Sequence, residues 1–201
     1  MLNNNHPRSA VIIPKMYNAS VEALYRELTY EFFSPDRSKM REAKLILAFK
    51  ENPYIEADIN LEIVPFIESC FVPVIYALHI DEQRNEWMRL LFVIFSGSNV
   101  ETSAFLVETT DEEKLKEKLL KWKSELDFLE SHHIIPFHFT KESMEPTNSG
   151  EIFREIFGIQ PAILRLSASE LAETGLIYCS SKTKVKRNPG PVYAIVGYKK
   201  F

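Results

Sequence analysis

The sequence predicts an α+β fold, with an N-terminal antiparallel sheet and helices followed by a C-terminal unit of two short helices and a basic hairpin. Three observations support it. β-branched and aromatic residues are concentrated in segments 71–80, 87–96 and 104–109. A helical pattern with an apolar seam follows at 111–131. Two short helical patterns separated by Gly158 then precede a lysine-rich segment.

Composition sets the broad class of the protein. The chain has 201 residues, enough for one domain or two small ones, and 26% of them are charged, as in ordinary globular proteins. Only 6 are glycine, which argues against glycine-rich phosphate loops. Cys70 and Cys179 lie in apolar segments and are expected to be reduced thiols. With no secretory signal or membrane-spanning run, we expect a cytoplasmic protein without membrane contact.

Residues 1–110 are expected to form an α+β module that serves dimerisation, sensing or docking. Helical spacing predicts a helix at 20–33 and a second at 36–50, although the apolar run 45–49 also fits a strand. Segment 59–63 fits either a strand or a helix. The short connections between the three later strand-like segments predict an antiparallel meander with both faces covered.

The second unit, 111–201, is expected to begin with a long helix. Thr110 and Glu113 form a capping-box pattern, and the helix is predicted to continue to about Ser131. Its apolar residues repeat at spacings of four and three, which fits a helix lying on a sheet or a helix that forms a dimer. These residues are Leu115, Leu119, Trp122, Leu126 and Leu129. A strand at 134–140 and a polar loop at 141–149 follow.

The C-terminal pattern predicts a winged helix-turn-helix. An apolar face in 151–157 predicts the first helix, and Gly158 allows the left-handed turn that ends it. Pro161 suits the first turn of a second helix, 161–174, which would act as the recognition helix and end at Gly175.

The basic hairpin would form the wing, 182–198. Segments 176–179 and 192–198 are predicted strands around a turn at 188–191. Residues 1–110 have a net charge of −5, whereas 148–201 have +4, and 182–201 contain six basic residues and no acidic one. Such a basic end on an acidic body can direct one face toward phosphates. Lysines also commonly protect an exposed strand edge from aggregation, which is the alternative interpretation.

Residues 152–198 resemble the winged helix-turn-helix domains of MarR-type and related transcription regulators. The resemblance implies DNA binding by a transcriptional regulator or a replication-associated factor, as a homodimer formed through 111–131 or the N-terminal module. It implies contacts in the DNA groove from Gln160, Arg165 and Ser169. The backbone contacts would come from Lys182, Lys184, Lys186 and Arg187. A protein-interaction module is the alternative, and no catalytic residue or cofactor is expected.

Two kinds of metal site are weaker alternatives. His132 and His138 share a strand face and, with His79, could bind zinc, but no familiar ligand spacing supports this, so surface or capping histidines are favoured. A metal-dependent nuclease would use acidic residues, yet no [DE]-x-K pattern follows them on a plausible catalytic strand. These residues are Glu56, Asp58, Glu62 and Glu108.

Overall fold

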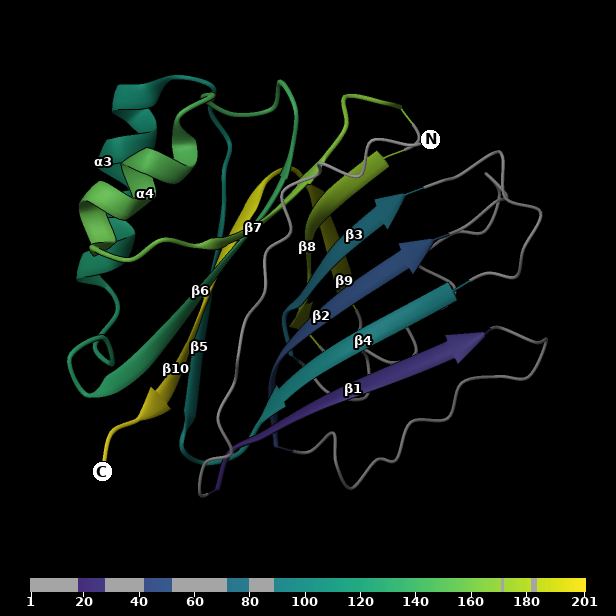
Figure 1. Ribbon diagram of the computed structural model, residues 1–201, viewed down its shortest axis with the longest axis vertical. Helices are drawn as coiled ribbons and strands as arrows, with labels where there is room; N and C mark the ends of the chain where they lie inside the picture. Colours follow the sequence, from purple (N-terminus) through teal and green to yellow (C-terminus); the bar gives the residue numbers. More distant parts are fainter. Residues whose placement is uncertain (1–17, 28–41, 52–71, 80–88, 171, 182–183) are drawn as a thin grey trace, which may run out of the picture.

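The computed structural model describes residues 18–27, 42–51, 72–79, 89–170, 172–181 and 184–201. Within these ranges the chain forms two β-sheets that face each other, and two helices cover the outer side of the smaller sheet (Figure 1).

The larger sheet has six strands in the order β1-β4-β2-β3-β8-β9. Strands β2 and β3 are parallel, and all the other neighbouring pairs are antiparallel. The strands are β1 (Ser20–Glu27), β2 (Ala43–Glu51), β3 (Val74–His79), β4 (Arg89–Ser96), β8 (Ala172–Ser181) and β9 (Lys184–Pro189).

The smaller sheet has four strands in the order β5-β10-β6-β7. Its members are β5 (Val100–Leu106), β6 (His132–Lys141), β7 (Ala162–Leu166) and β10 (Val192–Lys199). β10 is antiparallel to both of its neighbours, whereas β6 and β7 are parallel. Helix α3 (Glu112–Ser124) connects β5 to β6, and helix α4 (Ser149–Phe157) connects β6 to β7. Both connections are therefore helical crossovers between strands of the same direction.

The main core lies between the two sheets. Along β10, Val192, Ala194 and Val196 face this core, while Tyr193 and Ile195 pack against the helices. The alternation follows from the two-residue period of a strand, and β10 is buried on both faces because a layer lies on each side.

A tight turn connects the two sheets. Gly97, between β4 and β5, has φ +118°, and a Cβ atom there would stand 2.2 Å from the carbonyl oxygen of Asn18. Only glycine allows the chain to pass this close to neighbouring backbone. Thr102 also donates a hydrogen bond of 3.0 Å to the carbonyl oxygen of Lys44, which links β5 to β2.

Several predicted elements are confirmed. The strands expected around 71–80, 87–96 and 134–140 are β3, β4 and β6, and the first short helix is α4. Gly158 caps that helix in the left-handed conformation, as expected, with φ 74°. The long helix starts close to its predicted position, although Asp111 is the N-cap rather than Thr110, and it ends at Ser124 instead of near residue 131.

The seam of α3 packs within the chain. Leu115, Leu119 and Trp122 are buried against Tyr193 and Ile195 of the sheet, together with α4. The interpretation as a helix lying on a sheet is therefore confirmed. A homodimer through this helix or through the N-terminal module stays a prediction.

The predicted fold class, with a C-terminal winged helix-turn-helix, is wrong. Both sheets contain strands from each side of residue 110, and the described part of the chain is mostly β-structure. The expected helix at 20–33 is strand β1 where it is described, and the expected helix at 36–50 is wrong because residues 43–50 belong to β2, which confirms the alternative strand interpretation of 45–49. Residues 45–49 of β2 are apolar all round because β2 is a central strand with both faces buried. The expected meander is also wrong, since β3 and β4 are not neighbours and β5 belongs to the other sheet. Segment 59–63 lies outside the described residues.

The second helix of the predicted motif is also wrong. Residues 162–166 form β7, which pairs in parallel with β6, and residues 172–181 form β8. Backbone pairing with β6 outweighs the helical spacing of the apolar residues. The predicted wing is wrong as well, because β9 pairs with β8 in the larger sheet while β10 joins the smaller one. Residues 190–191 are thus a crossing between sheets.

Candidate nucleic-acid interface

The basic segment forms strand β9, at an edge of the six-stranded sheet. In the register of β8 and β9, Lys186 lies opposite Tyr178, and its ammonium nitrogen is 5.9 Å from the centre of the tyrosine ring. Lys186 is exposed and Tyr178 is partly exposed. Lys184 precedes Lys186 by two residues in the same strand, whereas Lys182 lies outside the described residues. The structure thus places an accessible cation beside an aromatic ring at the sheet edge.

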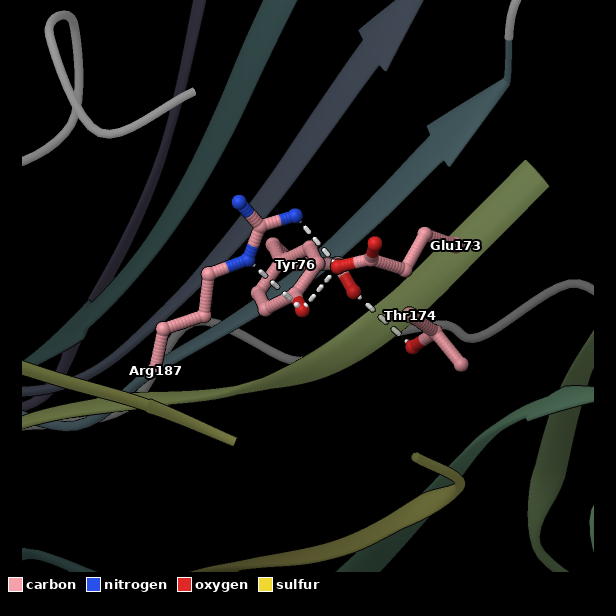
Figure 2. A network of polar contacts seen from close by, with 4 residues as sticks. All are labelled: Tyr76, Glu173, Thr174 and Arg187. Atoms are coloured by element: carbon pink, nitrogen blue, oxygen red, sulfur yellow. Dashed lines mark hydrogen bonds and ion pairs between the residues drawn. The ribbon is translucent and has the colours of Figure 1, made fainter. Parts of the chain in front are cut away.

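Arg187 is held in a polar network on the opposite face of β9 (Figure 2). Its Nε donates a hydrogen bond of 3.1 Å to the Tyr76 hydroxyl, and its guanidinium lies 5.0 Å from the centre of the Tyr76 ring. Arg187 also forms an ion pair with Glu173, which accepts a hydrogen bond from the Tyr76 hydroxyl. Thr174 donates a further bond of 2.8 Å to the Tyr76 carbonyl oxygen. The network therefore ties β9 and β8 to β3.

Burial and neighbouring charges alter the protonation of this network. Burial is the main cause that raises the pKa of Tyr76 above its usual range; the Arg187 hydrogen bond acts against it, and Glu173 reinforces it. For Arg187, burial acts to lower the pKa, but the hydrogen bonds to Tyr76 and Glu173 outweigh it and raise the pKa. The pair is a neutral phenol and a cationic guanidinium at neutral pH. Arg187 accordingly anchors β9, and Lys186 is the cation that β9 presents to solvent.

The three residues expected to contact the DNA groove do not share a helix. Gln160 is exposed between α4 and β7, Arg165 is exposed on β7, and Ser169 is exposed in the connection to β8. β7 is an edge of the four-stranded sheet and β9 is an edge of the six-stranded sheet. The structure therefore places the expected groove contacts on or beside a different sheet from the basic strand.

An open pocket lies at the end of β9. It has a volume of about 600 Å³ and is lined by residues 106–110, 188–191 and Met144. Asn188 belongs to β9, and Glu108 carries a carboxylate that is ion-paired with Lys118 at 3.3 Å. The pocket brings a carboxylate, hydroxyls and an amide side chain close to the basic strand.

A second polar cluster is buried between β6, β10 and α4. His138 is fully buried, and its Nε2 lies 3.0 Å from a carboxylate oxygen of Glu145. The other oxygen of Glu145 accepts a hydrogen bond from the Thr140 hydroxyl. The imidazole of His138 is stacked on Tyr193, with ring centres 3.9 Å apart. The expectation of a surface or capping histidine is therefore wrong for His138.

Among the described residues, His138 Nδ1 and Asn148 Oδ1 of this cluster have no hydrogen-bond partner. Burial raises the pKa of Tyr193 above its usual range, and the negative charge of Glu145 raises it further. Since the cluster is enclosed by β6, β10 and α4, we interpret it as part of the folded core.

The metal alternatives receive no geometric support where side chains are described. In those ranges, no group of three or more His, Cys, Asp or Glu residues is arranged to hold a metal. His132 Nδ1 lies 2.8 Å from the Ser131 hydroxyl oxygen and 3.1 Å from the Phe128 carbonyl oxygen. The side chain of His79 and the segment 56–62, which holds three of the suggested nuclease acids, lie outside the description.

Sequence reasoning missed Tyr76, Glu173 and Tyr178, which hold or accompany the basic strand. Tyr76 is distant in sequence from Arg187, so no local pattern could connect them. The two-residue alternation of β8 places Tyr178 on one face and Ile177 on the other. This alternation is the sequence signal that could have indicated Tyr178.

Comparison with known proteins does not place the chain in a family. No protein-family model matches it, and no curated protein sequence matches it significantly. None of the described helices is long and apolar enough to cross a membrane.

Proposed function

We propose that the protein binds nucleic acid by holding the phosphate backbone along strand β9. The observation that carries the proposal is the exposed Lys186 on an edge strand that also contains Lys184, in a chain whose net charge is −4. Lysines that contact phosphates release condensed counterions, which supplies a favourable and salt-dependent free energy of binding. The acidic body would repel phosphates elsewhere and so restrict binding to this edge.

The edge position supports this function physically. Among the described strands β9 has a neighbour on one side only, and the ion pair of Arg187 with Glu173 fixes its orientation. Lys186 can therefore meet a phosphate without rearrangement of the backbone. No recognition helix is part of this proposal, because residues 162–166 form a strand.

The test is fluorescence anisotropy with labelled mixed-sequence duplex and single-stranded DNA, titrated from low to physiological salt. We expect binding that weakens steeply with salt. The double variant Lys184→Ala/Lys186→Ala should weaken it and reduce the slope of log K against log salt by about 0.7–0.9 for each lost phosphate contact.

The matched control is Lys114→Ala/Lys116→Ala, which removes two exposed lysines from α3. It changes the net charge equally but should leave affinity near that of the parent protein. Equal weakening by both double variants would show a nonspecific charge effect and contradict the proposed interface. Absence of binding at low salt would instead leave β9 as an edge whose lysines prevent aggregation.

A further inference from the structure

The edge that carries Lys186 leads toward the pocket described above. Asn188 lines the pocket and follows Lys186 by two residues, so the two belong to one face of β9, roughly 7 Å apart along the strand. Tyr178 lies beside Lys186 on the neighbouring strand. Along this edge, a cation with an aromatic ring beside it is therefore followed by a pocket.

The aromatic ring distinguishes a single strand from a duplex. Proteins that bind single strands combine a cationic path for the backbone with rings on which unpaired bases stack. Tyr178 is partly exposed and the Lys186 ammonium stands 5.9 Å from its centre, so a phosphate and its base can be held at neighbouring points. Bases within a duplex are stacked on each other and present only their edges to a protein.

The pocket chemistry favours a base over a phosphate. The Glu108 side chain is 66% exposed, and its carboxylate, which is ion-paired with Lys118 through Oε2, can accept a hydrogen bond from an amino group. Thr109, Thr110 and Asn188 add hydroxyl and amide groups to the lining. Such groups can pair with the edge of an unpaired base. Cytosine offers an amino donor at N4, whereas thymine offers a carbonyl oxygen there.

We propose that the ligand is single-stranded nucleic acid, with phosphates along the β9 lysines, one base on Tyr178 and another base in the pocket. Glu108 selects a base with an amino group, cytosine above thymine. The inference rests on the proposed function, and its test separates the two.

The test uses the full chain at neutral pH with labelled 15-nucleotide oligo(dC), oligo(dT) and oligo(rC), and a mixed duplex. Both single-stranded DNAs should bind more tightly than the duplex, and oligo(dC) should bind about fivefold more tightly than oligo(dT). The comparison of oligo(rC) with oligo(dC) shows whether RNA or DNA is preferred.

Variants then test each part of the surface. Tyr178→Ala should weaken single-strand binding about tenfold and leave duplex binding unchanged, while Tyr178→Phe should retain affinity because the ring is kept. Glu108→Ala should reduce the preference for oligo(dC) over oligo(dT). The control Glu117→Ala removes an exposed carboxylate from α3 and should leave that preference intact.

The outcomes are distinguishable. Duplex binding as tight as single-strand binding, with no effect of Tyr178→Ala, overturns the inference and leaves the proposed function standing. Equal affinity for oligo(dC) and oligo(dT), unchanged by Glu108→Ala, overturns the base pocket. No binding to any of the four probes overturns both proposals.

Discussion

The phenol of Tyr76 lies across the backbone of Gly175, so that a Cβ atom on Gly175 would stand 2.5 Å from the tyrosine hydroxyl oxygen. The same Cβ would stand 2.5 Å from the carbonyl oxygen of Asn188 in β9. Glycine in the middle of β8 therefore allows two close approaches, one from the neighbouring strand on each side. The position of Arg187 depends on this arrangement, because Arg187 is bound to the Tyr76 hydroxyl.

We expect Gly175→Ala to lower the free energy of unfolding by about 1–3 kcal/mol, because the added methyl group must displace backbone as well as Tyr76. Urea denaturation measures this. Gly158→Ala is the comparison, since Gly158 has φ 74° and open space around it. Its cost should be about 1–2 kcal/mol, from the left-handed conformation alone. The ring signals of Tyr76 in NMR spectra report whether β9 keeps its position beside Tyr76. Unchanged Tyr76 signals in Gly175→Ala would contradict the close approach.

The buried carboxylate of Glu145 leads to a second prediction. Glu145→Ala removes the acceptor of His138 Nε2 and leaves the Thr140 hydroxyl with only the longer bond to the Lys141 carbonyl oxygen. We expect the free energy of unfolding to fall by about 2–4 kcal/mol. Each unsatisfied buried polar group costs about 1–3 kcal/mol, and water entry relieves part of this cost. Thermal and urea unfolding both measure it. Glu142→Ala, in the same loop but exposed, should change stability by less than about 0.5 kcal/mol.

Local signals in the sequence predicted the elements around α3, β6 and α4. The left-handed Gly158 and the seam of Leu115, Leu119 and Trp122 depend on residues near one another in the chain. The structure confirms both of these features, because short-range spacing largely determines where such elements begin, end and bury a face.

Pairing between distant strands could not be predicted in this way. Residues 162–166 show apolar spacing that fits a helix, yet they join β6 through a parallel ladder. Likewise, Arg187 was expected on a phosphate-binding wing, but its partners Tyr76 and Glu173 come from β3 and β8. The choice between these interpretations is made by tertiary contacts that leave no periodic mark in the sequence.

The aromatic column under α4 provides a third prediction. Phe153 is fully buried and stacks on Tyr193, with ring centres 4.8 Å apart and an interplanar angle of 9°. Phe153→Ala should lower the free energy of unfolding by about 3–5 kcal/mol, because it opens a cavity between helix and sheet. The neighbouring exposed Arg154 offers the control, as Arg154→Ala should change stability by less than about 0.5 kcal/mol. Similar losses in both variants would show that α4 does not pack as described.

Tyr198 predicts how stability changes at alkaline pH. Burial raises its pKa from 10.0 to about 12, and its hydroxyl has no partner among the described residues. Between these two pH values the unfolded chain loses the phenolic proton while the folded chain keeps it. The unfolded state then binds fewer protons, so the free energy of unfolding decreases as pH rises, by up to about 1.4 kcal/mol per pH unit for this group.

The matching variant is Tyr198→Phe, which keeps the ring in the core between the sheets and removes the titrating group. Denaturation at a series of pH values should show a flatter decline from pH 10 to 12, and stability at pH 7 should be equal or slightly higher because an unpaired buried hydroxyl is lost. Lysines and the other buried tyrosines titrate in both proteins, so the difference between the two curves isolates Tyr198. Parallel curves throughout this range would show that Tyr198 ionises as readily in the folded protein as in the unfolded chain, and hence that its hydroxyl is open to solvent.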